Sequence, residues 1–367
     1  MTTVIIMNAG SSSLKVSALR PDDQVADALS LDRWDGSPDH PELAEFLARA
    51  GRDAATVAHR VVHGGSRFTT AVRIDDSVVA AIEGLTELAP LHQTRALAGI
   101  EAARQALPGV PGVACFDTAF HAGLPDAAAR YALPDRWTTR FGLRRYGFHG
   151  LSHAYATRRA GAMLRRDPAD LRIVTCHLGA GASLAAVLHG RSVDTTMGFT
   201  PLEGLVMATR SGSVDPGLLV WLLQDDRLPL GEVAAALEQE SGLAGISGQP
   251  SGDMRDILQA AREGNQRAKL AVEVYLHRLR REIAAMAAAM NGLDVLLFTG
   301  GVGEHSPPVR AAAAAGLEFL GVTIDAGRNA ATADADISGS GPARVLVVTA
   351  REDLEMARQA RAVLAGP

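Results

Sequence analysis

Short apolar runs and longer amphipathic stretches alternate along the whole chain. Runs rich in β-branched and aliphatic residues predict strands at residues 3–7, 14–19, 56–62, 112–116, 171–176, 184–188, 294–299 and 344–349. Apolar positions spaced by three and four predict helices at residues 76–83, 92–106, 151–165, 266–290 and 352–364. Because strands and helices alternate, the pattern predicts an α/β fold.

Turns rich in Gly, Ser or His follow four of the predicted strands directly. They occupy residues 8–13, 63–66, 177–183 and 300–304. Ligands of α/β proteins bind at the carboxyl ends of strands, and Gly-rich turns let backbone N–H groups approach phosphate oxygens. A single turn of this kind usually has no binding role. Several of them in one chain favour a phosphate-containing ligand. No Gly-Lys-Ser or Gly-Lys-Thr opens a helix, so the pattern differs from a P-loop.

Two of these turns belong to similar segments. A strand, a polar turn and a second strand make up residues 3–19, and the same order returns at 171–188. The Asn8-x-Gly of the first segment corresponds to the His177-x-Gly of the second. This similarity predicts a duplicated core, although two hairpins can also resemble each other by accident.

Composition excludes several classes of protein. A chain of 367 residues suggests about two domains, and 47% hydrophobic with 21% charged residues is typical of globular proteins. A net charge of −5 argues against nucleic acid as a partner. The apolar runs are too short to span a membrane, and the N-terminus lacks the basic region of a signal peptide. We therefore expect a cytoplasmic protein in which Cys115 and Cys176 are reduced thiols.

A few charged residues near the turns suit phosphoryl transfer. Arg60 and Arg210 are candidates to grip phosphate or carboxylate, and Asp117 follows a strand where acids often hold Mg²⁺. His149 lies among glycines in the YGFHG segment. Each of these residues also has a purely structural interpretation. An arginine is commonly a surface residue, an aspartate at a strand end can cap a helix, and a lone histidine can make a structural hydrogen bond. Neither zinc-ligand spacing nor a Gly-x-Ser-x-Gly elbow occurs.

A series of segments resembles the signatures of the acetate kinase family, in family order and across essentially the whole chain. They are VIIMNAGSSSLKVSAL (4–19), HRVVHGGSRFT (59–69), APLH (89–92), ACFDTAFH (114–121), YGFHGLSH (146–153), CHLGAGAS (176–183), DTTMGFTPLEGLVMATRSGSVDPG (194–217), SGDMRD (251–256) and FTGGVGEHS (298–306). The resemblance implies a two-lobed actin-like ATPase fold with a duplicated core of the ribonuclease H type. It also implies the reversible reaction of ATP with acetate to give ADP and acetyl phosphate, and a homodimer.

The resemblance assigns lobes and residue roles. It implies a first lobe of residues 1–117 and 350–367 for substrate and metal, and a second lobe of residues 118–349 for nucleotide. The implied catalytic residues are Asp117, His149, Arg210 and Arg60, of which Arg60 binds the substrate carboxylate. The implied ligands of Mg²⁺, or of Mn²⁺ in its place, are Asn8 and Glu352. The implied nucleotide contacts are Lys15, His177, Leu178, Gly179, Ala180, Gly181, Asp253, Met254, Arg255, Gly301, Val302, Gly303, Glu304 and His305.

Elementary chemistry narrows the role of Asp117. Acetate is ionised at neutral pH, so no base is needed to create the nucleophile. Asp117 is therefore more plausible as a residue that orients Mg²⁺, its waters or a catalytic arginine than as a proton acceptor. The reaction must instead bring the acetate anion to an anionic phosphate. Arg60, Arg210, His149 and Mg²⁺ reduce the repulsion between these two negative charges.

The chain departs from the family's pattern at several positions. Ala180 stands where an asparagine is usual, and His305 replaces the asparagine of GIGEN. Gln93 follows APLH in place of asparagine, Ser213 replaces an aspartate, the loop before Asp253 is one residue longer, and the chain is about a tenth shorter than usual. Losing one neutral hydrogen bond costs about 1 kcal/mol, so Ala180 and His305 are expected to retune nucleotide binding rather than abolish it.

Other functions remain alternatives at this point. Propionate or butyrate is an alternative substrate, because one methylene changes binding by only about 1–3 kcal/mol. A catalytically weak paralogue is another alternative, given Ala180 and His305. A sugar kinase or a nucleotide-gated filament protein of the same fold is disfavoured, because neither needs a pair of arginines for a carboxylate.

Overall fold

The computed structural model describes residues 3–10 and 13–366, so Ser11 and Ser12 of the first predicted turn lie outside the described residues. The chain forms two compact units. Unit 1 comprises Met1–Ala122, Phe148–Tyr155 and Arg351–Pro367, and unit 2 comprises Gly123–Gly147 and Ala156–Ala350. No helix in these described ranges is long and apolar enough to cross a membrane.

Unit 1 is built on one mixed sheet. Its strands are β1 (Thr3–Ala9), β2 (Leu14–Leu19), β3 (Val25–Leu31), β4 (Ala54–Val61), β5 (Val72–Arg73) and β6 (Gly112–Phe116), in the order β3-β2-β1-β4-β6-β5. Its helices are α1 (Pro41–Ala50), α2 (Asp76–Glu83), α3 (Pro90–Ala106) and α14 (Glu352–Ala365), together with the start of α6 (Gly150–Leu164). β1 is antiparallel to β2 and parallel to β4, and β4 is parallel to β6.

The period of two along β1 divides its side chains between two cores. Ile5 and Met7 join a cluster with side chains of α1 and α3, whereas Val4 and Ile6 join a cluster with side chains of α14. Every side chain of these four is at most 2% exposed. Because successive residues alternate between faces, Asn8 lies on the α14 face with Val4 and Ile6.

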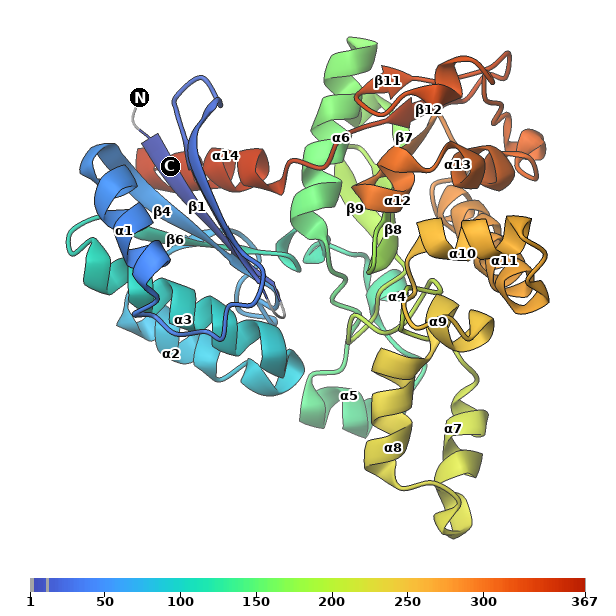
Figure 1. Cartoon of the computed structure of the whole chain (residues 1–367), viewed down its shortest axis with the longest axis horizontal. Helices are drawn as coiled ribbons and strands as arrows, with labels where there is room; N and C mark the ends of the chain where they lie inside the picture. The colour runs from blue at the N-terminus through green and yellow to red at the C-terminus, as the bar shows by residue number, and fades with distance from the viewer. Residues whose placement is uncertain (1–2, 11–12, 367) are drawn as a thin grey trace. The chain divides into compact units, whose positions relative to one another are not determined.

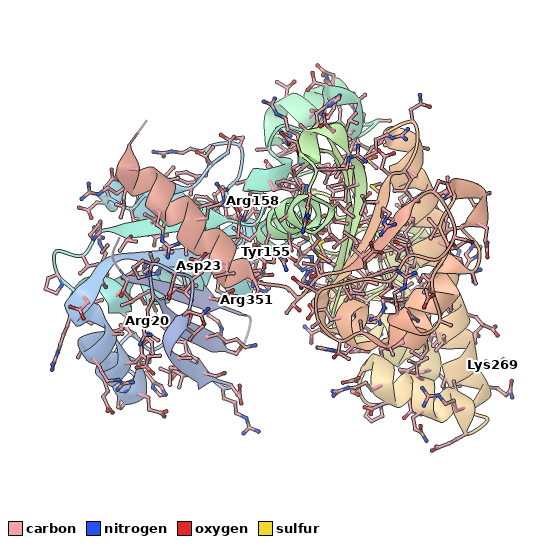
Figure 2. The ribbon with its side chains drawn as sticks, turned by 90° about the horizontal axis from the view of Figure 1, so that it is seen from above. Arg20, Asp23, Tyr155, Arg158, Lys269 and Arg351 are labelled. Atoms are coloured by element: carbon pink, nitrogen blue, oxygen red, sulfur yellow. The ribbon has the colours of Figure 1, made fainter. Side chains whose placement is uncertain are left out.

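The C-terminal helix therefore covers the N-terminal strands. Figure 1 shows α14, at the red end of the colour scale, beside the blue strands of unit 1. Arg361 of α14 donates to the carboxylate of Asp23, at 2.7 Å, and to the carbonyl of Arg20, at 3.0 Å. Arg351 precedes the helix and interacts electrostatically with Tyr155 and Asp23, which are labelled in Figure 2.

Unit 2 contains a second mixed sheet. Its strands are β7 (Arg172–Leu178), β8 (Ala182–Leu188), β9 (Arg191–Thr195), β10 (Val295–Thr299), β11 (Ala335–Asp336) and β12 (Arg344–Val347), in the order β11-β12-β10-β7-β8-β9. Its helices are α4 (Asp126–Ala129), α5 (Asp135–Phe141), most of α6, α7 (Pro216–Leu223), α8 (Leu230–Ala235), α9 (Gly242–Ser247), α10 (Met254–Arg262), α11 (Gln266–Ala289), α12 (Gly300–His305) and α13 (Pro307–Ala314).

The two sheets have the same topology. β7, β8, β9, β10, β12 and β11 take the places, pairings and directions of β1, β2, β3, β4, β6 and β5. Asn8 and His177 are each the last residue but one of their strand. The predicted α/β class and the predicted duplication are therefore confirmed.

Local details differ from the sequence expectations at strand ends. Asn8 and His177 were expected in turns, but both are paired with the neighbouring strand, opposite Lys15 and Ser183 respectively. The expected turn at 300–304 is the short helix α12. A run of apolar residues in the sequence locates only the interior of a strand. The backbone hydrogen bonds to the neighbouring strand continue for one or two polar residues beyond that run. Several helices of unit 2, including α7 to α10, were not expected.

Candidate active site

Alternation places three predicted residues on one face of the unit 1 sheet. Asn8 shares its face of β1 with Ile6, and Arg60 shares its face of β4 with Ala58, both in the core under α14. Asp117 follows Phe116 directly, where β6 ends. Because β1, β4 and β6 are parallel neighbours, their carboxyl ends meet at one edge. Asn8, Arg60 and Asp117 are therefore brought together.

Arg60 is the centre of this group. Its Nε donates to Oδ1 and Oδ2 of Asp117 at 3.3 and 3.1 Å, and its Nη2 donates to Oδ2 at 2.7 Å. Its Nη1 donates to Oδ1 of Asn8 at 3.1 Å and lies 3.9 Å from Oε2 of Glu352. The Asp117 side chain is 1% exposed and that of Arg60 is 16% exposed, so the pair is largely shielded from water.

The charges of this group depend on one another. Burial disfavours the cation of Arg60, but the carboxylates of Asp117 and Glu352 outweigh burial and raise the pKa of its guanidinium. Burial raises the pKa of Asp117, Arg60 opposes that shift, and the charge of Glu352 adds to it. Two carboxylates thus surround one guanidinium, so the group carries an excess of negative charge when both are ionised.

Glu352 reaches this edge from the end of the chain. It is the first residue of α14, and its Oε2 accepts a hydrogen bond of 3.3 Å from Nδ2 of Asn8. Lys15 pairs with Asn8 across the β1–β2 ladder and is exposed. Directly paired residues of antiparallel strands project from the same face, so Lys15 lies on the side of the sheet that carries Asn8.

His149 is linked to Asp117 by a backbone hydrogen bond of the next residue, Gly150. Its φ of 57° lies in the left-handed region, between Gly147 at 71° and Gly150. Gly150 donates its N–H to the Asp117 carbonyl at 2.9 Å, and a Cβ at position 150 would lie 2.1 Å from the same oxygen. Glycine is therefore required where the start of α6 crosses the end of β6.

The departure at Gln93 has a structural explanation. Gln93 is fully buried, its Oε1 accepts from the N–H of His63 at 3.2 Å, and its Nε2 donates to the His63 carbonyl at 3.0 Å. The N–H of Gly65 donates to Nδ1 of the same histidine at 2.9 Å. Gln93 thus holds the turn that follows β4.

Unit 2 contains a cavity of about 930 Å³ at the corresponding strand ends. Eight residues predicted to contact nucleotide line it: Gly179, Ala180, Asp253, Met254, Arg255, Gly301, Val302 and His305. They come from the β7–β8 turn, the start of α10 and the short helix α12. The volume is within the range of small-molecule sites.

Five other predicted contacts in unit 2 do not line this cavity, and Lys15 belongs to unit 1. The five in unit 2 are His177, Leu178, Gly181, Gly303 and Glu304. Glu304 is buried, and its Oε1 accepts from the N–H groups of Gly300 at 2.8 Å and Ala350 at 2.9 Å. Its side chain therefore joins the end of β10 to the segment after β12.

Sequence reasoning missed one wall of the cavity. Leu258, Gln259 and Arg262 line it from α10. They stand three, four and seven residues after Arg255, which is the spacing of one helix face. That spacing is visible in the sequence, but helix α10 itself was not predicted. Tyr275 of α11 also lines the cavity, and its buried hydroxyl has no hydrogen-bond partner among the described residues.

Both nucleotide-side departures lie on the cavity wall. The backbone carbonyl of Ala180 accepts from the N–H of Ala208 at 3.0 Å, while its methyl group offers no polar contact. The side chain of His305 is 59% exposed and its Nε2 lies 3.9 Å from Oε2 of Glu304. An imidazole and a methyl group therefore take the places where the family pattern has two amides.

Arg210 is the one arginine of unit 2 that was predicted to be catalytic. Its Nη1 donates to the Pro201 carbonyl at 3.4 Å, and it forms no ion pair with a carboxylate in the described part of the chain. Burial lowers the pKa of its guanidinium, and the charge of Glu238 opposes that shift. A partly buried cation without a direct counter-ion is suited to bind an anion.

Two units that repeat one mixed-sheet topology, each with polar groups at equivalent strand ends, define the two-lobed fold of the actin-like ATPases. A family model described as the Acetokinase family matches residues 42–358. An acetate kinase of Synechococcus sp. is 53% identical over 84% of this chain and 77% of its own length. An acetate kinase of Bacillus subtilis is 41% identical over 98% of both chains.

Solved structures agree with this match. A crystal structure of Porphyromonas gingivalis acetate kinase has a TM-score of 0.91 at 36% identity and covers 99% of this chain and 100% of that chain. A propionate kinase from Francisella tularensis has a TM-score of 0.90 at 33% identity and covers 98% of this chain and 99% of that chain. The chain belongs to the acetokinase family, and the family resemblance expected from the sequence is confirmed.

Proposed function

We propose that this enzyme transfers the γ-phosphoryl group of ATP to acetate and forms ADP and acetyl phosphate, reversibly. A carboxylate oxygen of acetate attacks the γ-phosphorus, and the bond from that phosphorus to the β–γ bridging oxygen of ATP breaks. The observation that carries the proposal is the cavity of unit 2, where eight residues of the family's nucleotide pattern meet from the β7–β8 turn, the start of α10 and the short helix α12. In this proposal unit 2 binds the nucleotide and unit 1 holds substrate and metal.

The residues of unit 1 support a role in handling anions. Arg60 offers a planar guanidinium at the sheet edge, and a guanidinium grips a carboxylate through two parallel hydrogen bonds. Asp117 holds Arg60 in orientation through three contacts. Because acetate carries no proton at neutral pH, Asp117 needs to remove none. His149, Arg210 and Lys15 are proposed to stabilise charge on the phosphoryl groups.

The oxygen donors of unit 1 fit a magnesium ion. Mg²⁺ is usually held by one or two carboxylates together with waters and substrate phosphates. Asn8 and Glu352 supply an amide oxygen and a carboxylate at one edge, and the excess negative charge around Arg60 favours a divalent cation. No three His, Cys, Asp or Glu side chains gather as a complete metal site within the described ranges, so phosphate and water would supply the other ligands. When bound, Mg²⁺ or Mn²⁺ would neutralise charge on the phosphates.

The remaining expectations are also part of this proposal. We propose a homodimer on the basis of the family resemblance, and a cytoplasmic location on the basis of the sequence. Sedimentation equilibrium of the purified protein tests the dimer, because a single species of one chain's mass at micromolar concentration would contradict it.

The first experiment measures acyl phosphate directly. Purified protein is incubated with Mg·ATP and acetate, propionate or butyrate, and the product is trapped as hydroxamate. We expect product with acetate, a loss of at least about a hundredfold in turnover in Arg210→Ala, and little change in Arg227→Ala, a surface arginine paired with Asp225. A wild-type protein that yields no product with any acid overturns the proposal, and a larger yield with propionate or butyrate moves it to that substrate.

The donor site is tested separately with a nucleotide panel. ATP and GTP kinetics are compared for wild type, His305→Asn and Ala180→Asn. We expect the KM for nucleotide to change by about tenfold in these variants, which corresponds to one neutral hydrogen bond. Equal ATP and GTP kinetics in wild type and His305→Asn would exclude a role of His305 in donor choice.

A further inference from the structure

We propose that Glu203 is a positioning residue for Arg210. Together with Tyr131 and Arg145 it forms a group of three side chains, here called the Glu203 brace, which holds residues 196–213 in the conformation that presents the Arg210 guanidinium. This inference rests on the proposed role of Arg210 in phosphoryl transfer. All residues of the brace and of this loop belong to unit 2.

Both oxygens of Glu203 are engaged by the brace. Tyr131 donates its hydroxyl to Oε2 at 2.6 Å, and Arg145 donates from Nη2 to Oε1 at 2.6 Å. The side chains of Arg145 and Glu203 are 17% and 34% exposed, so this ion pair is more shielded than a surface pair. The guanidinium also lies over the Tyr131 ring, 5.5 Å from its centroid.

The two partners of Glu203 also bind the backbone of the loop. The Tyr131 hydroxyl accepts from the N–H of Phe199 at 2.8 Å. Nη1 of Arg145 donates to the carbonyls of Thr196 and Met197 at 3.2 and 3.1 Å. The brace therefore clamps the incoming half of the loop from segment 129–147 of the same unit.

Close packing leaves the brace little freedom. A Cβ at Gly198 would lie 1.8 Å from Oε2 of Glu203 and 2.2 Å from the Tyr131 hydroxyl. The carbonyl of Gly198 accepts from the N–H of Tyr146 at 3.0 Å. Glycine at position 198 is what allows the carboxylate and the phenol to sit against the backbone.

Short backbone connections lead from Glu203 to Arg210. Two residues before Glu203, the Pro201 carbonyl accepts the hydrogen bond from Nη1 of Arg210 at 3.4 Å. Directly after it, Gly204 donates its N–H to the Ser213 hydroxyl and accepts from the Ser213 N–H, each at 3.0 Å. A shift of Glu203 would therefore move both the acceptor of the Arg210 side chain and the stem of the loop.

The brace also explains why Arg210 keeps its charge available. The carboxylate of Glu203 is occupied by Arg145 and Tyr131, so the one acid among residues 196–213 is not used to neutralise Arg210. The guanidinium is oriented by a backbone carbonyl instead. A cation held in this way can turn its remaining N–H groups toward an anionic substrate.

The test separates positioning from general stability by a double-mutant cycle. Glu203→Gln and Tyr131→Phe are made in the wild type and in Arg210→Ala, and kcat and KM are measured by hydroxamate trapping and ADP release. We expect Glu203→Gln to lower kcat by about tenfold to a hundredfold, with the KM for ATP within about twofold of wild type, because a misplacement near 1 Å has that cost. Tyr131→Phe shifts kcat in the same direction by a smaller factor. In the Arg210→Ala enzyme the same changes alter kcat by less than about twofold, because the group they position is gone.

A matched control replaces another ion pair of the same unit. Arg172 and Asp294 form a pair of 2.8 Å at the amino ends of the parallel strands β7 and β10, with side-chain exposures of 38% and 30%. Asp294→Asn is expected to leave kcat within about twofold of wild type. Equal factors for Glu203→Gln in both backgrounds, or a wild-type kcat in Glu203→Gln, would overturn the positioning role while leaving the proposed function intact. A wild type that forms no acyl phosphate would overturn both.

Discussion

Arg60 and Asp117 form a two-pronged ion pair at the ends of adjacent parallel strands, with Nη2 and Oδ2 2.7 Å apart. The pair exists because β4 and β6 are in register, with Val61 opposite Phe116, so that both side chains emerge at the same edge. Because Asp117 is buried, its ionised carboxylate is stabilised by the charge and hydrogen bonds of this guanidinium. The pair therefore sets both the stability and the charge of the candidate site.

Arg60→Lys is expected to lower turnover with acetate by about a hundredfold or more. A lysine ammonium cannot offer the fork that contacts Asp117 and Asn8 together. Hydroxamate formation at saturating ATP measures the effect. The control is Arg104→Lys, which alters an exposed pair with Asp76 of similar length, 2.6 Å. Turnover of Arg60→Lys within threefold of the control would contradict the expected role.

Gly150→Ala is expected to destabilise unit 1 by about 1–3 kcal/mol and to reduce activity, because the new methyl group would overlap the Asp117 carbonyl. The free energy of unfolding in urea measures the first effect. Gly123→Ala is the control, since nothing lies within 4 Å of a Cβ at that position. Equal unfolding free energies for the two variants would show that α6 and β6 separate without cost.

Stability is expected to fall as the pH drops from about 6.5 toward 4. Burial lowers the pKa of His59 to about 3, and burial lowers that of His121 to about 4 against the effect of its hydrogen bond to Phe148. Both histidines have a folded pKa below the unfolded value of about 6.5, so the stability they contribute is present above that value and is lost below it. For His59 the loss reaches about 3 kcal/mol by pH 4.5.

Urea midpoints measured from pH 7.5 to pH 4.5 test this dependence. His59→Gln has no imidazole to protonate, so its midpoint is expected to fall less steeply than that of the wild type over this range. Parallel pH profiles for the two proteins would mean that His59 binds its proton equally in the folded and unfolded states, so that burial does not lower its pKa.

Tyr275→Phe is expected to stabilise the protein by about 1 kcal/mol, because it removes a buried hydroxyl that has no partner among the described residues. Tyr131→Phe is the matched variant, and it is expected to lose about 1 kcal/mol since its hydroxyl both donates and accepts. Differential scanning calorimetry without nucleotide compares the two. A lower melting temperature for Tyr275→Phe would show that its hydroxyl has a bound partner in solution.

Local patterns in the sequence determined much of the fold. Apolar runs located β1, β2, β4, β6, β7, β8, β10 and β12, and the three-and-four spacing located α11 to within one residue. The repeated strand, turn and strand predicted the duplication. Alternation within one strand is also local, because the period of a strand follows from its backbone geometry, and it groups Asn8 with Ile6 on β1 and Arg60 with Ala58 on β4.

Only the tertiary structure decided which distant residues meet. Asn8 and Glu352 are 344 positions apart, and they are joined because α14 buries its apolar face on β1, β4 and β6. The wall that α10 gives to the cavity and the brace around Glu203 also depend on packing between segments far apart in sequence. Backbone geometry acts over a few residues, whereas these contacts depend on which apolar faces cover each other, and local periodicity does not specify that choice.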